Sequence, residues 1–255
     1  MIDLTTNNNF DFGIGLENKN SDFRILCSNI SNNYDLLIFT DSKGTSVGDC
    51  ANKEWTIQII NNFKLKKKTF LFISRPKEIT TFFTLLNFLK LNKIKFKNLI
   101  SNVGFVDFTP KKEEFIDDII TQNPFKNYKI NKYVLCDYTL NSLETVKLYS
   151  INYLNLSKEI SELLGKKFSK IFLIETFEFK SDIKIRRKRP LKFFTQLNEG
   201  NKFIKLVCSQ SNQFLFVNVN NKLPKNGNTF SYDGVHFTQN GHDKLADICI
   251  KKIIL

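Results

Sequence analysis

The sequence predicts an α/β protein, a three-layer α/β/α sandwich around a central, mostly parallel sheet of five strands. Five short apolar runs are spaced along the 255 residues, and segments with the apolar period of a helix lie between them. Parallel strands that alternate with helices form a sheet covered on both faces, which explains why the runs are apolar throughout. Hydrophobic residues make up 42% of the chain, enough for the core of one domain.

The predicted strands are, in order, "DLLIFT" (35–40), "KTFLFIS" (68–74), "FKNLIS" (96–101), "KIFLIE" (170–175) and "QFLFVNV" (213–219). Helices are predicted at 55–63, 80–91, 109–120, 191–210 and about 239–253. The helix at 109–120 is expected to open with Thr109 as its N-cap and Pro110 at its first position. Residues 142–167 are expected to form one or two helices that end near Gly165.

The domain organisation follows from this pattern. Residues 1–33 are polar and rich in asparagine, and we expect them to form an N-terminal extension. Residues 34–255 are expected to form a single domain. Its predicted helical insertion at about 125–169 is longer than a minimal crossover needs, so we expect it to cover the functional site.

The net charge of +13 does not by itself identify a partner, because the lysines are spread over the whole chain. Solvated faces explain them best, and no nucleic acid partner is expected. The one dense basic run is "KSDIKIRRKRPLK" (180–192). It is either a solvated loop or a contact for an anionic substrate or surface.

Several classes of protein are disfavoured. The five cysteines are scattered without metal-ligand spacing, so neither a metal site nor a disulfide framework is expected. No signal peptide pattern or membrane-length apolar segment is found, and a cytoplasmic location is expected. No glycine-rich phosphate loop is present, and no cofactor is expected.

Candidate functional residues follow the predicted strands, because sheets of this type bind ligands outside the carboxyl ends of their strands. Ser42, in "TDSKG", stands at a strand-to-helix turn that would expose its hydroxyl and its N–H, although such stretches are also common as plain turns. Asn102, in "SNVGFVDFTP", could aim its amide at a developing oxyanion or bond to its own backbone.

Both histidines of the chain lie in "SYDGVHFTQNGHDKLAD" (231–247). Asp233 stands three residues before His236, so one turn can bring its carboxylate to the imidazole Nδ1 and leave Nε2 free as a base. Thr238 is expected to cap the final helix. His242 falls inside the helix start and is expected to be a packing or surface residue.

These motifs resemble the signature blocks of the SGNH (GDSL-like) hydrolase superfamily. "DGVHFTQNGHDKLAD" is similar to the last block, "TDSKG" to the first, and "ISNVGFVD" to the block with the oxyanion asparagine. The order agrees over residues 35–255. The resemblance implies a flavodoxin-like SGNH hydrolase fold, with Ser42 as nucleophile, Asp233 and His236 completing a triad, and Ser42 and Asn102 in the oxyanion hole.

The chain departs from the family at three places. Thr40 stands where the family has glycine before Asp-Ser, and Ile100 and Val103 flank the asparagine where glycine and aspartate are usual. "SRPKE" (74–78) replaces the glycine block after the second strand, so a second oxyanion N–H would come from Ser74 or Arg75. Arg75 could alternatively bind an anionic group of the substrate.

The resemblance implies a serine esterase that removes a short acyl group, such as acetyl, from a carbohydrate or another small molecule. The substrate would be a small-molecule or glycan acyl ester, and neither metal nor cofactor is needed. Two alternatives remain: transfer of the acyl group to a sugar hydroxyl, and a catalytically silent anion- or glycan-binding module that uses the basic residues 186–189. The insertion and the basic run are expected to set acyl-group specificity.

Overall fold

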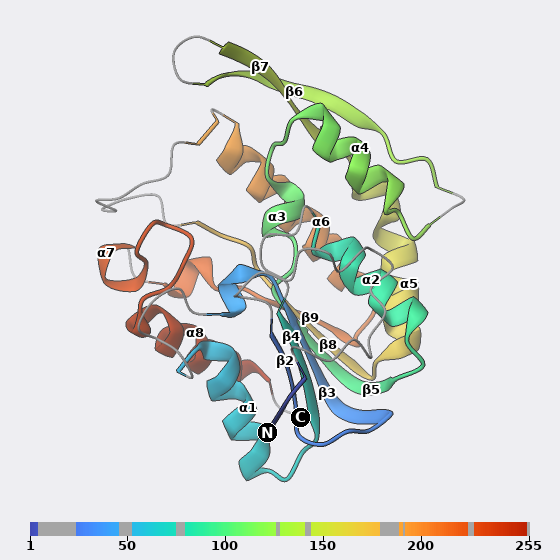
Figure 1. The fold of residues 1–255 in the computed structure, drawn as a ribbon, viewed down its shortest axis with the longest axis vertical. Coiled ribbons are helices and arrows are strands. Elements are labelled where there is room, and N and C mark those ends of the chain that lie inside the picture. The colour runs from blue at the N-terminus through green and yellow to red at the C-terminus, as the bar shows by residue number, and fades with distance from the viewer. Residues whose placement is uncertain are drawn as a thin grey trace.

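The computed structural model describes most of the chain and shows the predicted sandwich (Figure 1). It describes residues 1–4, 24–45, 53–74, 80–125, 128–140, 144–178, 189–190, 192–223 and 227–253. Across these ranges, no helix has both the length and the apolar character needed to cross a membrane.

All five predicted strands are confirmed. They are β3 (Asn33–Thr40), β4 (Phe70–Ser74), β5 (Lys95–Ser101), β8 (Lys170–Ile174) and β9 (Phe214–Val217). They pair in parallel in the order β4-β3-β5-β8-β9. Numbered by their own sequence order, this is the 2-1-3-4-5 order of flavodoxin-like sheets. Phe39 pairs with Ile73 on one side and with Ser101 on the other, so the carboxyl ends of the three strands are level.

The sheet has more strands than the five expected, because two short segments of residues 1–33 join it. Strand β1 (Ile2–Asp3) and strand β2 (Arg24–Cys27) extend the sheet to seven strands, and β2 pairs antiparallel with β4. The physical reason lies in the apolar residues Ile25, Leu26 and Cys27, which are buried against β4. Strand β2 therefore covers β4, which would otherwise be the edge strand of the parallel sheet.

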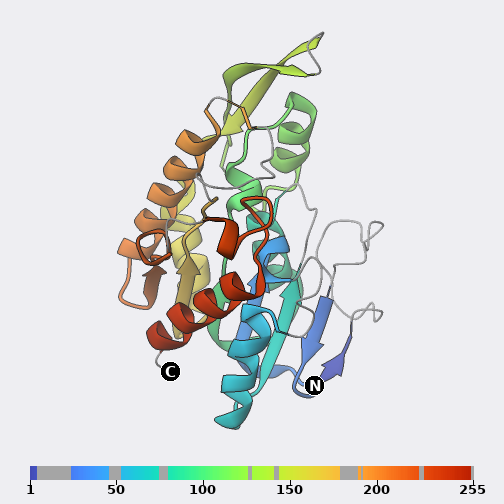
Figure 2. The same ribbon diagram turned by 90° about the vertical axis from the view of Figure 1, so that its left-hand side faces the viewer.

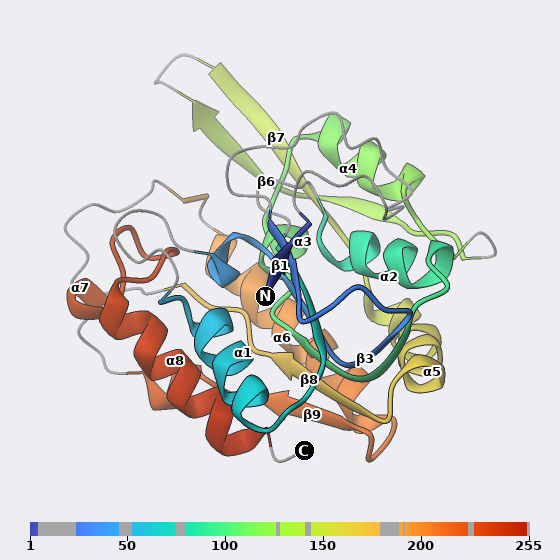
Figure 3. The same ribbon diagram turned by 60° about the horizontal axis from the view of Figure 1, so that its bottom comes forward.

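Side-chain alternation along β3 builds the two cores. Leu36 and Ile38 face the core beneath α1 (Trp55–Leu65) and α8 (Gln239–Lys252). Leu37 and Phe39 face the opposite core, beneath α2 (Phe82–Leu91), α5 (Ser157–Lys167) and α6 (Phe193–Ser209). Figures 1 and 3 show these two helical layers on either side of the sheet. The three-layer prediction is confirmed.

The predicted helical insertion is only partly helical. Strands β6 (Lys132–Leu140) and β7 (Glu144–Ile151) form an antiparallel hairpin, and only α5 of the predicted helices is present. The hairpin extends beyond the carboxyl ends of the central strands, at the top of Figure 1. The segment "ETVKLYSI" is rich in β-branched and aromatic residues, which favour a half-buried strand over a helix.

The remaining helices are short or begin at residues other than those predicted. The helix predicted from Thr109 begins instead at Glu113, as α4 (Glu113–Thr121). Thr109 ends α3 (Phe105–Phe108), where its hydroxyl donates to the carbonyl of Val106. Among the described residues, the other short elements are α7 (Gly227–Phe230) and three single 3₁₀ turns (Ser42–Gly44, Leu154–Leu156 and Asn220–Lys222).

Candidate active site

Two loops that are distant in sequence meet where β3 and β5 end, at the point where the strand order reverses. Asp41 follows β3, and Asn102 follows β5. The Asp41 N–H donates to Asn102 Oδ1 at 3.2 Å, and Asn102 Nδ2 donates to Asp41 Oδ1 at 3.0 Å. Folds of this class bind ligands at this crevice. The structure thus brings together the Ser42 turn and Asn102, two of the predicted site elements.

The turn at Ser42 is a 3₁₀ turn capped by Asp41, whose Oδ1 accepts the Lys43 N–H at 2.8 Å. The side chain of Thr40 lies against Gly44, where an added Cβ would be 2.1 Å from Thr40 Oγ1. Thr40, which stands where the resemblance expects a glycine, therefore fits against the turn only because residue 44 has no Cβ. Ser42 is half-buried, and its N–H has no hydrogen-bond partner among the described residues.

The two residues proposed for a second oxyanion donor have different outcomes. Ser74 ends β4, and its hydroxyl donates to the carbonyl of Asp41 at 3.3 Å. Its side chain therefore supports the turn, and a role for its N–H stays a prediction. Arg75 lies outside the described residues.

Asp233 and His236 are paired as the spacing predicts. The ring Nδ1 of His236 lies 3.0 Å from Asp233 Oδ2. Asp233 Oδ1 accepts the N–H groups of Val235 and His236, both at 2.9 Å. Burial opposes ionisation of this carboxyl, but the hydrogen bonds from His236 and Val235 outweigh it, and the net pKa of Asp233 lies below its ordinary value. An ionised Asp233 holds Nδ1–H and directs Nε2 away from itself.

The loop that carries this pair is held by its own backbone. The carbonyl of His236 accepts the Ser231 hydroxyl at 2.7 Å and the Tyr232 N–H at 3.1 Å. Gly234 has a φ of 90°, a conformation that disfavours any other residue. Thr238 caps α8, as predicted, by accepting the Gly241 N–H. The imidazole is thus mounted on a loop fixed at both ends.

The second histidine is a packing residue. His242 is fully buried, its Nδ1 accepts the Trp55 N–H at the start of α1 at 3.3 Å, and its ring packs edge-on against Phe237. Burial lowers the pKa of His242 to about 4, so the ring is neutral at pH 7 and can accept this bond.

Sequence reasoning missed the buried lysine next to the predicted nucleophile. Lys43 is only 4% exposed, and its ammonium donates to the carbonyl of Phe177. The ammonium also lies 3.9 Å from the ring centroid of Phe105 and 4.6 Å from that of Phe177. Burial lowers the pKa of Lys43 to about 8, against the opposing charges of Asp41, Glu178 and Asp233. In a chain with 38 basic residues, nothing in the sequence distinguishes this lysine from the others.

Part of the predicted basic run also reaches this site. Arg189 forms an ion pair with the buried carboxylate of Glu178, at 2.6 Å, and its guanidinium carbon lies 4.5 Å from the Phe193 ring centroid. Arg189 therefore has its partner within the protein. This differs from both predictions for the basic run, a solvated loop and a contact for an anionic substrate or surface. Residues 180–188 and 191 lie outside the described ranges.

Phe177 connects the Ser42 turn to the His236 loop. Its ring lies beneath the Lys43 ammonium and 5.7 Å from the ring of Phe237, the residue after His236. Figures 1 and 2 show the short 3₁₀ turn after β3 close to the loop that precedes α8. The structure therefore places Ser42, Asn102, Asp233 and His236 at one end of the sheet. Within the described ranges, no cluster of side chains suited to a metal ion is found.

Comparison with known proteins gives similarity in structure only. The sequence matches no protein family, and no curated protein matches it. A solved structure of a member of the lipolytic protein G-D-S-L family from Veillonella parvula DSM 2008 is similar with a TM-score of 0.54 at 9% identity, over 86% of this chain and 97% of that one. A variant of an acetyl xylan esterase from Geobacillus stearothermophilus is similar with a TM-score of 0.53 at 12% identity, over 86% and 94% of the two chains.

Proposed function

Because the chain has the fold of SGNH (GDSL-like) hydrolases, we propose that it is a serine esterase that uses Ser42, His236 and Asp233. The observation that carries the proposal is the hydrogen-bonded Asp233–His236 pair, at the same end of the sheet as the Ser42 turn. Substrates of this class of sheet bind at that end. A structural aspartate–histidine pair would not need a serine turn beside it.

The proposed reaction begins when His236 Nε2 takes the proton of the Ser42 hydroxyl and the oxygen attacks the acyl carbon. The His236 ring then donates this proton to the departing alcohol. Water, activated by the same nitrogen, releases the acyl group as a carboxylic acid. Asp233 stays ionised throughout, because its hydrogen bonds keep its pKa low, and it stabilises the imidazolium formed in both steps.

The oxyanion would be held by two donors on adjacent loops. The N–H of Ser42 has no partner in the described structure. Asn102 Nδ2 donates one of its two hydrogens to Asp41, which leaves the other for the substrate. The hydrogen bonds between Asp41 and Asn102 fix the amide before the substrate arrives, and one such preorganised donor typically contributes about 2.7–4 kcal/mol of transition-state stabilisation.

For the substrate, we propose a short acyl ester, such as acetyl, on a carbohydrate or another small molecule. The acetyl xylan esterase among the similar structures makes acetylated polysaccharides the first substrates to test. Acyl transfer to a sugar hydroxyl would use the same residues. Product analysis with and without an added sugar acceptor separates transfer from hydrolysis.

The experiment is labelling with a fluorophosphonate probe, followed by hydrolysis of a short-chain nitrophenyl ester. Ser42→Ala and His236→Ala are compared with Ser211→Ala and His242→Asn, which replace the same residue types outside the proposed triad. We expect labelling to vanish in the first pair and to persist in the second. Absence of labelling in folded wild-type protein would overturn the esterase and favour a silent binding module.

The role of Asp233 has its own test. Asp233→Asn keeps an oxygen that can accept the backbone N–H groups of Val235 and His236, so the loop is expected to hold its conformation. The amide cannot stabilise the imidazolium, and kcat is expected to fall by a factor on the order of 10⁴. A fall of less than about tenfold would exclude Asp233 from the triad.

A further inference from the structure

The buried ammonium of Lys43 joins three segments that carry the proposed site. Lys43 lies in the 3₁₀ turn, directly after Ser42. Its ammonium donates to the carbonyl of Phe177, which follows β8, and lies 3.9 Å from the ring centroid of Phe105, which follows β5. One charged group on the turn of the proposed nucleophile thus contacts the segments that follow two other strands.

The main chain of this turn is fixed without the ammonium. The Lys43 N–H donates to Asp41 Oδ1 at 2.8 Å, and the Lys43 carbonyl accepts the indole N–H of Trp55 at 2.8 Å. The carbonyl of Gly44 accepts the Thr56 hydroxyl at 2.7 Å. The main chain therefore holds the turn on α1, and the side chain adds the connection to the segments after β5 and β8.

The ring of Phe177 extends this connection toward the proposed base. Its centroid lies 4.6 Å from the Lys43 ammonium and 5.7 Å from the ring centroid of Phe237, which follows His236 directly. Both rings are buried. Because protein interiors are close-packed, a shift of Phe177 is transmitted to the loop that holds the imidazole.

The ring of Phe105 makes the matching connection to the proposed oxyanion donor. Phe105 lies three residues after Asn102 and is buried. The hydrogen bonds with Asp41 fix the amide of Asn102 relative to the turn. The contact between Phe105 and Lys43 holds the main chain that follows this amide.

Stability alone does not account for a charge at this position. Lys43 is only 4% exposed, and taking an ammonium out of water is costly. The charges of Asp41, Glu178 and Asp233 favour the ammonium, and that of Arg189 opposes it. Replacement of a whole buried ion cluster by apolar residues is often neutral or favourable for stability. A buried ammonium does fix geometry, because it needs acceptors at defined positions.

We propose that Lys43 is a positioning residue of the esterase, whose ammonium holds the loops of Asn102 and His236 in the geometry that attack by Ser42 requires. The inference rests on the proposed function, because it assigns a role in the same reaction. Lys43 acts through its neighbours, and we assign it no contact with the substrate.

The first test compares kcat and KM for a short-chain nitrophenyl ester in folded variants. A displacement of about 1 Å can cost about 100-fold in rate, so we expect Lys43→Met to lower kcat by about 100-fold and to change KM by less than about threefold. Lys43→Arg keeps the charge and should recover part of the loss. The matched control is Lys111→Met, because the ammonium of Lys111 also donates to backbone carbonyls, those of Val106 and Thr109. A kcat of Lys43→Met equal to that of Lys111→Met would overturn the proposal.

The pH dependence of kcat is a readout that a purely structural role would not change. Burial lowers the pKa of Lys43 to about 8, although the charges of Asp41, Glu178 and Asp233 raise it, so the ammonium loses its proton as the pH rises through 8. We expect the kcat of wild type to fall above pH 8 toward that of Lys43→Met, which should stay level. Burial also lowers the pKa of Lys111 to about 8, and Lys111→Met should keep the fall. An equal fall in Lys43→Met would assign it to another group and reject the role of the ammonium.

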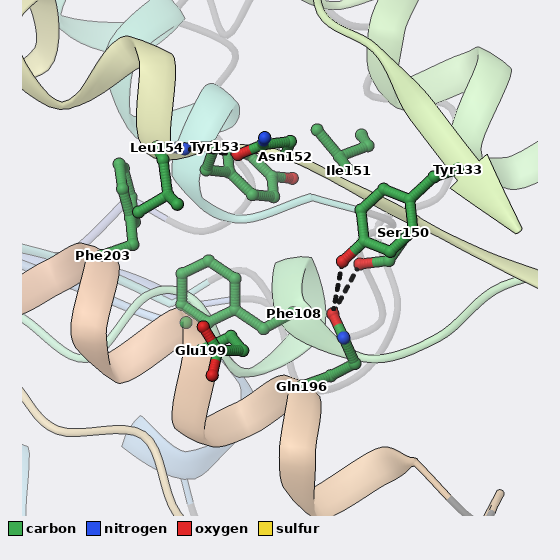
Figure 4. A pocket seen from close by; sticks show the side chains of 11 residues that line it. Phe108, Tyr133, Ser150, Ile151, Asn152, Tyr153, Leu154, Gln196, Glu199 and Phe203 are labelled. Atoms are coloured by element: carbon green, nitrogen blue, oxygen red, sulfur yellow. Dashed lines mark hydrogen bonds between the residues drawn. The ribbon is translucent and has the colours of Figure 1, made fainter. Parts of the chain in front are cut away.

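A second variant tests the same connection with every charge in place. Phe177→Leu removes the ring between Lys43 and Phe237, and we expect kcat to fall about tenfold. Its control is Phe203→Leu, a buried ring in a pocket that none of the proposed catalytic residues lines; Figure 4 shows Phe203 there together with Phe108. Equal kcat values in the two leucine variants would count against the proposal even if Lys43→Met does not fold.

A measurement on the free protein separates this proposal from the esterase. The chain has two histidines, so His236→Ala identifies the imidazole NMR signals of His236. We expect these signals to shift in Lys43→Met and in Phe177→Leu but not in Lys111→Met. Shifted signals in a protein that never reacts with fluorophosphonate would retain the connection and reject the esterase. Unshifted signals would overturn the connection whether or not the protein hydrolyses esters.

Discussion

The buried histidine gives a prediction that concerns the fold alone. His242 is 0% exposed, and its pKa of about 4 in the folded protein is below the ordinary value of 6.5. Between these two values the unfolded chain binds a proton that the folded protein does not. The stability contributed by a neutral His242 is therefore complete above pH 6.5 and is lost as the pH falls toward 4. The difference of 2.5 pH units corresponds to about 3 kcal/mol.

Asp41 changes stability in the opposite direction over the same pH range. Burial raises the pKa of Asp41 to about 6, against the charge of Lys43 and two hydrogen bonds, so the folded protein binds this proton more readily than the unfolded chain. Its contribution to stability grows as the pH falls from 6 to about 4. The two effects largely cancel in the total stability of the wild type. Only a comparison with a variant isolates the contribution of His242.

The assay is urea unfolding of wild type and His242→Asn at several values between pH 4 and pH 7. Asparagine Oδ1 can replace Nδ1 as the acceptor of the Trp55 N–H, so the variant should fold. We expect wild type to exceed the variant in stability at pH 7 and to lose about 3 kcal/mol of that advantage by pH 4. Phe237→Leu perturbs the same ring contact without removing a titratable group, and its effect should not change with pH. If the difference in stability between wild type and His242→Asn also stayed constant between pH 7 and pH 4, the argument would be refuted.

Three further predictions concern stability and packing. Lys43→Met removes the positive charge that compensates the buried carboxyl group of Asp41 and should cost about 3–5 kcal/mol in urea unfolding, and adding Asp41→Asn should recover part of that loss. A double variant no more stable than Lys43→Met alone would show that the two charges do not interact. Asp107→Ala removes the acceptor of the Thr81 and Phe82 N–H groups at the start of α2, and a loss of about 2–4 kcal/mol is expected in the same assay. Gly200→Ala places a Cβ 2.0 Å from the Phe108 ring, so Tm should fall, by an amount equivalent to about 1–3 kcal/mol; an unchanged Tm would mean that the ring moves freely.

The central sheet could be predicted from sequence because its signal is local. Each of the five parallel strands is an apolar run buried on both faces, and such runs are visible without knowledge of their neighbours. The Asp233–His236 pair is local in the same sense, since both partners lie within one turn. The N-cap at Thr238 needs only its own side chain and the helix that follows.

The parts that the sequence did not reveal depend on contacts between distant segments. Strand β2 is four residues long and becomes recognisable only when paired with β4. The mutual hydrogen bonds of Asp41 and Asn102 join residues 61 positions apart, and no pattern in either loop specifies them. The pattern of apolar and polar residues in "ETVKLYSI" fits the period of a helix as well as that of a strand, and pairing with β6 makes the segment a strand.

The antiparallel addition of β2 has a consequence for solubility. Strand β4 is "FLFIS", buried at all five positions, and without β2 it would present an apolar row of unpaired backbone groups to solvent. Exposed strand edges of this kind pair with other chains and lead to aggregation. With β2 and β1 in place, this side of the sheet ends in a strand of two residues, too short to act as a template. Expression of this protein from residue 28 onward should therefore yield aggregates, even though every proposed catalytic residue would be present.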